Sequence, residues 1–202
     1  LSDYEVLKGP IMNAVASGVD VIIMNSGTPD QAREVGALMY VGQPEYDAGY
    51  AAGLRAKGDG VGSFLCVNHY ISSPSSTERC QGFADGLGVD LGNQMIDSGQ
   101  DPAEIKNRVL AYLSANADTD AVLTLGPTSA DPTLLALDEN GMAGDIYFGT
   151  FDLGEEVAQS LALAIDPYLT GPDADRVREE HDLAEKGPQG PLQEALAKLK
   201  KG

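Results

Sequence analysis

Short apolar runs alternate with longer helix-forming stretches through most of this chain, and this alternation limits its fold more than any other feature. The runs are rich in Val, Ile and Leu, are too short for a stable helix, and are mostly bounded by Gly, Asn or Asp. Strands that alternate with helices are typical of a parallel sheet covered by helices. The sequence therefore predicts an α/β protein with strands near residues 19–25, 37–41, 61–67, 94–97, 121–125 and 145–149.

Two predicted helix starts are marked by an Asp followed by a Pro. Asp101 precedes Pro102, which combines a capping carboxylate with a proline at the first helical position. Asp131 precedes another proline in the same way, and an Asn-Gly pair at residues 140–141 is expected to end that helix. We therefore interpret Asp101 and Asp131 as helix caps rather than as ligand-binding residues.

The charge of the chain argues against nucleic acid as a partner. The sequence has 31 acidic and 13 basic residues among 202, which gives a formal net charge of -18. Such a charge repels phosphate backbones and anionic membrane surfaces. The longest strongly apolar runs, such as residues 21–24, fall far short of the roughly 20 residues that cross a bilayer. We therefore expect a soluble protein that binds no nucleic acid.

The cysteines and histidines favour neither a metal site nor a cofactor. Two residues of each type are too few for a zinc site of conventional spacing, so we predict no bound metal and no cofactor. Cys66 and Cys80 fall on a predicted strand and on the next helix, where they form either a disulfide, in an oxidising compartment, or buried thiols. The chain begins at Leu1, with neither an initiator Met nor a signal peptide, so its location is not evident from a targeting segment.

Cys66 and His69 together suggest an alternative function, a thiol-dependent hydrolase. Alternation along a strand would place the two side chains on opposite faces, and no third group that would orient the histidine is evident. We therefore predict no catalytic residues and place His69 at the rim of a cleft. The glycine-rich residues 57–62 follow a helix and enter a strand, the reverse of a phosphate-binding loop, so we also reject a nucleotide site.

Four polar residues follow predicted strands or open the helix after one. Asn25 and Asp152 come after apolar runs, Asn68 ends another, and Arg79 lies in the first turns of the next helix. The carboxyl ends of parallel strands meet at one edge of a sheet, where open α/β proteins bind small ligands. Taken singly, Asn25 also fits an Asx turn, Asp152 a helix cap and Arg79 a solvated helix surface. Together, the four residues favour one polar cleft.

Five segments carry a resemblance to a known family: residues 21–27, 40–49, 66–69, 78–83 and 148–152. They are similar to the type 1 periplasmic sugar-binding proteins of ABC importers, whose core also serves as the effector domain of LacI-like repressors. The resemblance runs from about Ser2 to Leu169, and it implies two three-layer αβα lobes that close on a sugar. It divides the chain into a partial N-terminal lobe (1–58), a C-terminal ligand-binding lobe (59–170) and a charged linker with a tail helix (171–202). A hinge is expected near residues 57–60.

The resemblance also implies roles for the four polar residues. Arg79 matches an arginine that clamps sugar hydroxyls, Asp152 matches the acid at the end of a Gly-x-Phe-Asp strand, and Asn25 matches a polar residue that ends a strand of the first lobe. Asn68 lies in a loop that faces the ligand in such proteins, whereas residues 46–47 are expected to be structural. The implied ligand is a small sugar or polyol, the implied partner a membrane permease, and the implied location the periplasm. The alternative is the effector-sensing domain of a LacI-like regulator or receptor.

The sequence departs from this family at both ends. Several strand-helix units that begin the family's first lobe have no counterpart here, and a glutamine-containing motif before residues 167–169 is also missing. Residues 19–24 would be flanked by strands in a complete lobe. Without those strands an apolar edge faces water, so we expect the chain to associate with itself or to have a poorly ordered N-terminal region.

Overall fold

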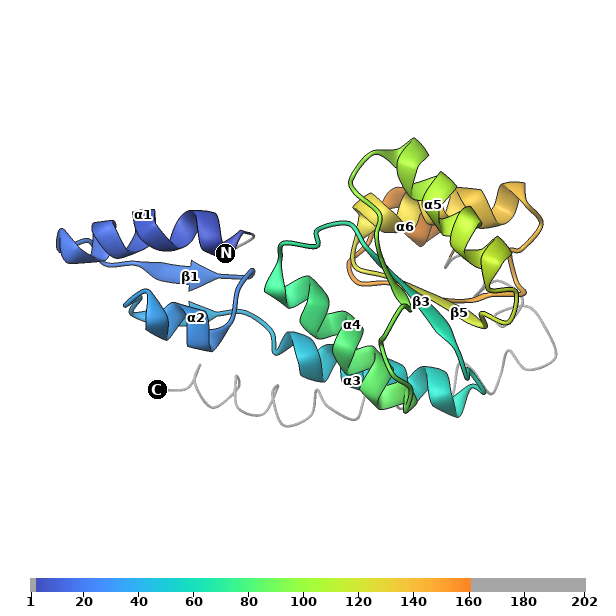
Figure 1. Ribbon diagram of the computed structural model, residues 1–202, viewed down its shortest axis with the longest axis horizontal. Coiled ribbons are helices and arrows are strands. Elements are labelled where there is room, and N and C mark those ends of the chain that lie inside the picture. The colour runs from blue at the N-terminus through green and yellow to red at the C-terminus, as the bar shows by residue number, and fades with distance from the viewer. Residues whose placement is uncertain (1–2, 161–202) are drawn as a thin grey trace, which may run out of the picture. The chain divides into compact units, whose positions relative to one another are not determined.

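The computed structural model of the protein describes residues 3–160, in which helices and strands alternate (Figure 1). Each predicted strand region contains a strand, although every strand is shorter than its predicted range, and the α/β prediction is confirmed. The predicted domain limits stay predictions, and the predicted tail at 171–202 lies outside the described residues. The elements are α1 (Tyr4–Ala16), β1 (Ile22–Met24), α2 (Pro29–Glu34), β2 (Met39–Val41), α3 (Glu45–Gly58), β3 (Phe64–Asn68), α4 (Pro74–Leu87), β4 (Met95–Asp97), α5 (Pro102–Ala115), β5 (Ala121–Thr124), α6 (Pro127–Glu139) and β6 (Tyr147–Gly149).

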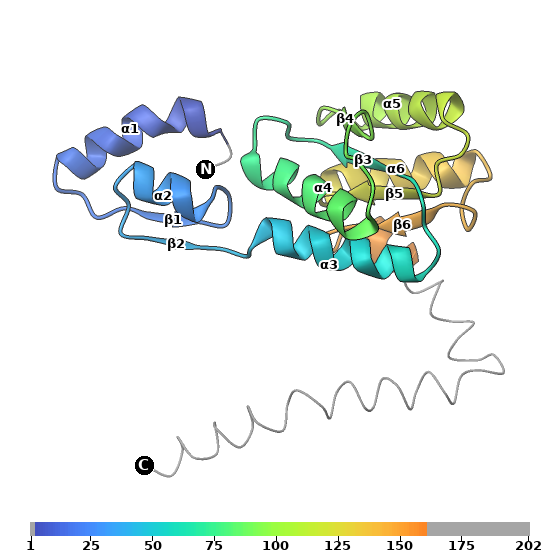
Figure 2. The same cartoon turned by 60° about the horizontal axis from the view of Figure 1, so that its bottom comes forward.

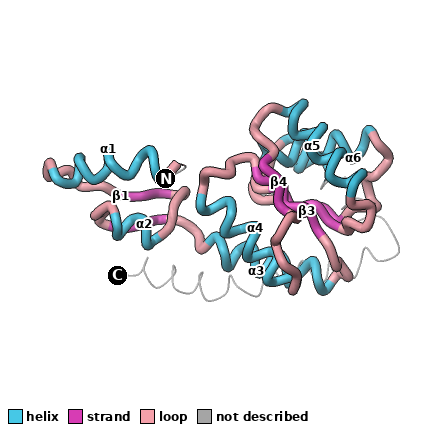
Figure 3. Tube along the Cα trace, in the orientation of Figure 1, coloured by secondary structure: helices cyan, strands magenta, loops and turns pink. Residues whose placement is uncertain are grey.

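Strands β3 to β6 form a four-stranded parallel sheet in the order β4-β3-β5-β6. Helices cover both of its faces: α3 and α4 lie on one side, and α5 and α6 lie on the other (Figures 1 and 3). Strands β3 and β5 are therefore buried along their whole length, as is usual at the centre of a parallel sheet. We call these strands and their helices the doubly covered sheet.

Alternate residues of β3 point into two separate hydrophobic clusters. Phe64 and Cys66 pack with Phe83 and other residues on the α3 and α4 side. Leu65 and Val67 pack with apolar residues of α5 and α6 on the opposite side. Burying a large apolar side chain contributes roughly 2 kcal/mol. The two clusters hold β3 in place from both sides, and they thereby fix the position at which this strand ends.

Helices α3 and α4 approach each other so closely that only glycine fits at their crossing. A Cβ atom added at Gly53 would lie 2.2 Å from the carbonyl oxygen of Phe83, and one added at Gly82 would lie 2.1 Å from the carbonyl oxygen of Tyr46. Both distances are far shorter than a normal contact. The same close approach occurs at Gly49 and Gly86. This packing sets the backbones of α3 and α4 directly against each other.

Strands β1 and β2 form a separate two-stranded parallel sheet, and the helices of residues 3–160 cover one face of it. Helices α1 and α2 lie on the same side of it (Figure 2), where they help to bury Ile23. On the other side, side chains that are 48% to 67% exposed form what we call the bare β1–β2 face: Ile22, Met24, Met39 and Val41. The apolar edge expected of residues 19–24 is a different surface, namely the edge of β1 that does not pair with β2. The expected self-association stays a prediction.

One of the two predicted helix caps is wrong. Asp101 caps α5 as predicted, because its Oδ1 accepts hydrogen bonds of 3.0 Å from the backbone N–H groups two and three residues later. Helix α6, however, begins at Pro127 with Gly126 as its N-cap, so Asp131 lies inside the helix. The Gly-Pro pair starts the helix about one turn earlier because proline fits the first helical position. The glycine-rich residues 57–62 connect α3 to β3, as predicted.

Candidate functional site

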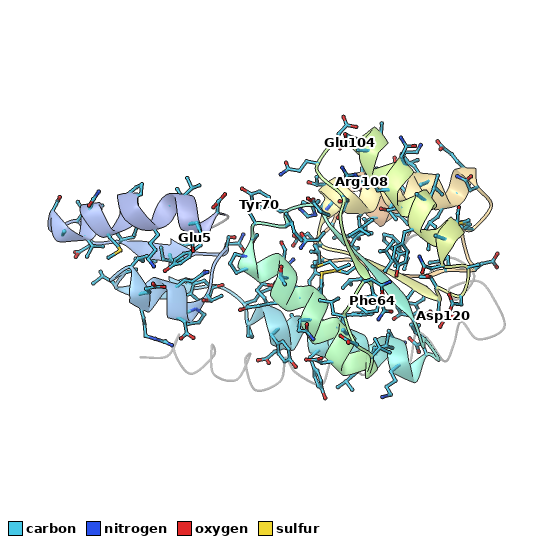
Figure 4. The ribbon with its side chains drawn as sticks, viewed as in Figure 1. Glu5, Phe64, Tyr70, Glu104, Arg108 and Asp120 are labelled. Carbon is cyan, nitrogen blue, oxygen red and sulfur yellow. A yellow bond between two sulfur atoms is a disulfide. The ribbon has the colours of Figure 1, made fainter. Side chains whose placement is uncertain are left out.

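Polar side chains gather where β3, β5 and β6 end, and we call this border of the sheet the carboxyl edge. In Figure 4, Tyr70 lies just after β3 at this edge, and Asp120 lies just before β5 at the opposite edge. Because the strands are parallel, the loops that follow them share one edge. The loop after β3 contributes His69, the loop after β6 contributes Asp152, and α4 contributes Arg79.

Arg79 is held in one position by three different contacts. Its Nε donates to Oε2 of Glu45 in an ion pair whose side chains are only 14% and 2% exposed. Its Nη1 donates to the carbonyl oxygen of Leu125 at 3.1 Å, and its guanidinium carbon lies 4.5 Å from the ring centroid of Phe151. Within residues 3–160 its Nη2 has no hydrogen-bond partner. Arg79 is therefore not a solvated helix residue, and its Nη2 can meet a ligand with little further loss of side-chain freedom.

A cavity of about 490 Å³ lies beside the ion pair of Arg79 and Glu45. Burial raises the pKa of the Glu78 carboxyl, and the nearby Glu45 carboxylate raises it further. Burial, followed by the charges of both glutamates, also raises the pKa of the Tyr40 hydroxyl. The wall of this cavity is therefore acidic. Its lining includes Gly27, Tyr40, Gln43, Glu45, Tyr46 and Glu78.

His69 is fixed by a hydrogen bond to the first turn of α6. Its Nδ1 lies 3.0 Å from Oγ of Ser129, and this hydroxyl donates to the carbonyl oxygen of Gly126 at 3.2 Å. With the hydroxyl proton on that carbonyl, the Ser129 oxygen accepts the N–H of the His69 Nδ1. Burial, and then the charge of Arg79, lower the pKa of the imidazole, so the ring is neutral at pH 7. The neutral ring carries its lone pair on Nε2.

Gly126 leaves room between His69 and Asp152. A Cβ atom built at Gly126 would lie 3.7 Å from Cε1 of His69 and 3.8 Å from Oδ2 of Asp152. The imidazole and the carboxylate therefore border the same small space at the carboxyl edge. Arg79 joins them there, because it contacts Leu125 and the Phe151 ring, which precede Gly126 and Asp152 in the chain.

Asn25 and Asp152 share an unusual backbone conformation. Their φ angles are 61° and 62°, and they are the two non-glycine residues of the described range with a positive φ. Asn and Asp adopt this conformation more readily than other residues, and it is common at ligand-binding positions. The backbone of Asn25 is held by hydrogen bonds to Val41 and from the Tyr40 hydroxyl. In residues 3–160, no hydrogen bond or ion pair joins the Asn25 side chain to Arg79 or Asp152.

Asn68 ends strand β3, as the apolar run predicts, whereas the family resemblance implies a loop at this position. It is the last residue of β3, where pairing with Asp97 of β4 draws it into the sheet, and it is fully buried. Its Oδ1 accepts from the backbone N–H of Tyr70 at 2.9 Å, and its Nδ2 lies 3.6 Å from the sulfur of Met95. These contacts hold the turn that carries His69. A direct role for Asn68 in binding stays a prediction.

Cys66 and Cys80 form a disulfide that joins β3 to α4. Of the two possibilities left open by the sequence, the disulfide is therefore the one present. The alternative of a thiol-dependent hydrolase is contradicted, because both cysteines of the chain are in this bond and His69 contacts Ser129 instead. Since Cys80 follows Arg79 directly, the disulfide also ties the arginine's turn of α4 to β3.

No group of three or more His, Cys, Asp or Glu side chains in residues 3–160 is arranged to hold a metal ion. The helices of the same range are all too short or too polar to span a membrane.

Sequence reasoning misses three residues that shape the carboxyl edge. Glu45 lies 34 residues before Arg79, and no spacing rule links the two. Ser129 lies in the first turn of α6, ahead of the predicted helix start at Asp131, so the sequence does not indicate its contact with His69. Phe151 could have been predicted from the sequence, because an aromatic side chain directly before Asp152 is well placed to stack on a neighbouring cation.

Comparisons with known proteins agree with this architecture. The model of a family described as a periplasmic binding protein domain matches residues 1–166. A carbohydrate transporter from Acidothermus cellulolyticus 11B, solved in complex with myo-inositol, is 31% identical, with a TM-score of 0.70 over 81% of this chain and 56% of that chain. Among curated proteins, no match was found.

Two more distant structures share the fold. A periplasmic sugar-binding protein from Legionella pneumophila is 18% identical, with a TM-score of 0.69 over 81% of this chain and 62% of that chain. A solute-binding protein from Burkholderia graminis C4D1M, solved with D-arabinose, is 19% identical, with a TM-score of 0.68 over 79% of this chain and 57% of that chain. This chain thus spans between 56% and 62% of the length of the three proteins. With most of its length matched by the family model, the chain belongs to the periplasmic binding protein domain family, as its resemblance predicts.

Proposed function

We propose that this chain belongs to a solute-binding protein of an ABC importer and binds a small, neutral sugar or polyol. The observation that carries the proposal is the fixed arginine at the carboxyl edge, where Arg79 has an Nη2 without a partner in the described range and Asp152 offers carboxylate oxygens. A hydroxyl group both donates and accepts hydrogen bonds, so a polyol matches a donor and an acceptor held close together. The relatives solved with myo-inositol and with D-arabinose support the same ligand class.

The charges at the site favour a neutral ligand over an acid. The positive charge of Arg79 is already matched by the buried carboxylate of Glu45. Asp152 forms no ion pair within residues 3–160, and the Glu78 carboxyl lies on the nearby cavity wall. A sugar carboxylate or phosphate would therefore meet the negative charge of these carboxylates, while the Arg79 guanidinium is already paired.

Asn25 is proposed to complete the site from the first lobe. It lies at the end of β1, outside the doubly covered sheet, and its left-handed backbone directs the chain into the loop that begins with Ser26. Family members close two lobes on their ligand by a hinge motion, and the predicted hinge is near residues 57–60. On closure, the Asn25 amide would supply a donor and an acceptor from the opposite side. Asn68 is proposed to act indirectly, by holding the turn that carries His69.

The disulfide between Cys66 and Cys80 supports a location in the periplasm. Disulfides persist mainly in oxidising compartments such as the bacterial periplasm. In this setting the partner of the proposed solute-binding protein is a membrane permease of an ABC importer. The net charge of -18 supports the expectation that nucleic acid is not a partner.

The proposal is tested by calorimetry with a panel of neutral and acidic ligands. The panel comprises myo-inositol, D-arabinose, other pentoses and hexoses, and D-glucuronate as the acid. We expect at least one neutral compound to bind and D-glucuronate to bind at least tenfold more weakly. Failure of every neutral compound to bind would contradict the proposed function, and a preference for D-glucuronate would contradict the charge argument alone.

Arg79→Lys tests the arginine without leaving Glu45 as an unpaired buried charge. Lysine keeps the cation but loses the planar fork that reaches Glu45, Leu125 and a ligand together, so affinity should fall by about tenfold or more. Arg55→Lys is the matched control, because Arg55 lies on α3 with its side chain 77% exposed. Unchanged affinity in Arg79→Lys would remove Arg79 from the site.

A further inference from the structure

His69 is positioned as a binding group that the proposed site does not yet use. Its ring is half-buried at the carboxyl edge, its Nδ1 is bonded to Ser129, and its Nε2 has no hydrogen-bond partner within residues 3–160. This nitrogen is not among the buried side-chain atoms of residues 3–160 that lack a partner, so it is open to solvent. A ligand hydroxyl at this edge can take the place of water as its hydrogen-bond donor.

We propose that His69 is a further ligand-binding residue, whose Nε2 accepts a hydrogen bond from a ligand hydroxyl group. The inference rests on the proposed function, and it adds a specificity-determining contact to it. The Ser129 hydroxyl, which donates to Gly126, fixes the ring proton on Nδ1 and so leaves Nε2 as the acceptor. Because the bond between Nδ1 and Ser129 orients the ring, Nε2 is already in position before the ligand binds.

The space over Gly126 explains how one ligand reaches both His69 and Asp152. A methyl-sized group at Gly126 would already be in van der Waals contact with both side chains, at 3.7 Å and 3.8 Å. Any side chain larger than hydrogen at this position would occupy that space itself. The absence of a side chain at Gly126 therefore leaves a space that the His69 ring and the Asp152 carboxylate both border.

Two acceptors and one donor define the ligand pattern more closely. Nε2 of His69 and the Asp152 carboxylate accept hydrogen bonds, whereas Nη2 of Arg79 donates. A ligand with two neighbouring hydroxyl groups can donate one bond to each acceptor and accept one from the arginine. We therefore infer selection for ligands with an intact pair of hydroxyl groups, and rejection of the analogue in which one of them is replaced by hydrogen.

The first experiment measures binding of myo-inositol and D-arabinose by calorimetry to the full chain and its variants. His69→Ala should lower the affinity by about tenfold, whereas His69→Gln, whose side-chain oxygen can also accept, should lose about threefold or less. Glu5→Gln, at an exposed position of α1, is the control, and it should leave the affinity unchanged. Affinity unchanged in His69→Ala while Arg79→Lys is impaired would overturn this inference and leave the proposed function standing.

A second measurement needs no substitution at His69 and so does not depend on the folding of a variant. The nitrogen-15 resonances of the two imidazoles in the unaltered chain are followed by NMR as myo-inositol or D-arabinose is added. Binding should shift the Nε2 resonance of His69. A ligand that binds by calorimetry without moving the His69 Nε2 resonance would overturn the inference. Absence of binding by both compounds would overturn it together with the proposed function.

Discussion

The two sheets of this chain differ in how their strands are covered, and the difference decides which of them can hold a rigid site. All residues of β3 and β5 are buried, whereas β1 buries only the middle one of its three residues. Both sheets are parallel and apolar in sequence, so composition does not separate them. Within residues 3–160, helices cover both faces of the doubly covered sheet and one face of the β1–β2 sheet (Figures 2 and 3). Arg79, His69 and Asp152 all belong to the doubly covered sheet and its loops.

The largest effect is expected where α3 and α4 pack without side chains. In Gly53→Val, the new Cβ would lie 2.2 Å from a backbone oxygen of α4, so the helices would have to separate. We expect a loss of about 4 kcal/mol or more in the free energy of unfolding, or no folded protein. Denaturant unfolding, monitored by circular dichroism, measures this loss in the free energy of unfolding.

Gly58→Val on the same helix is the control for this prediction. Gly58 is exposed, and a Cβ there would meet nothing within 4 Å. Its effect should stay within about 0.5 kcal/mol, because valine is at least as good a helix former as glycine. Equal losses in both variants would mean that the close crossing of α3 and α4 does not limit stability.

The second prediction compares a strand residue from each sheet. Leu65 of β3 is fully buried between two covered faces, and Leu65→Ala should cost about 3 kcal/mol. Met24 of β1 is 67% exposed, and Met24→Ala should cost less than about 0.5 kcal/mol. Thermal unfolding of both variants provides the measurement. A similar cost at both positions would show that the bare β1–β2 face is covered in solution.

The third prediction concerns what the bare β1–β2 face does in solution. Its four apolar side chains form a flat patch, and we expect it to drive self-association. Met24→Glu should lower the average mass seen by light scattering at high protein concentration, with a loss of about 1 kcal/mol in association free energy. Leu135→Glu on α6, where the side chain is 41% exposed, is the control and should not change the mass. A monomeric unaltered chain at every concentration would contradict this prediction.

Local features were predicted well because they depend on neighbours in the chain. The six strands follow from short apolar runs, and Asp101 caps α5 because a carboxylate and a proline stand side by side. The start of α6 shows the limit of this reasoning, since Asp131-Pro132 and Gly126-Pro127 both fit a helix start. The sequence alone does not show which of these two pairs starts the helix, because packing decides between them.

The candidate site was predicted only in part because its geometry depends on distant residues. Asp152 was predicted to follow a strand and Arg79 to lie in the first turns of a helix, and the structure brings both to the carboxyl edge. The partner of Arg79 is Glu45, which reaches it only because α3 and α4 cross without side chains. Nothing in the local pattern around Asn68 shows that pairing with β4 would bury it. Contacts between residues that are distant in the chain cannot be predicted from such local sequence patterns.

The smallest effect is expected from Glu78, which faces another carboxylate. Burial and then Glu45 raise the pKa of Glu78 above its ordinary value of 4.5, so folding favours its protonated form. Stability from this group is therefore present at low pH and is lost as the pH rises through the raised pKa. Glu78→Gln should be more stable than the unaltered chain by about 0.5 kcal/mol at pH 7, and no more stable at pH 4. Glu5→Gln, at an exposed position of α1, should show no such gain. Thermal unfolding of both variants at both pH values provides the measurement. A gain of equal size at pH 4 and pH 7 would mean that Glu78 acts through packing and not through its charge.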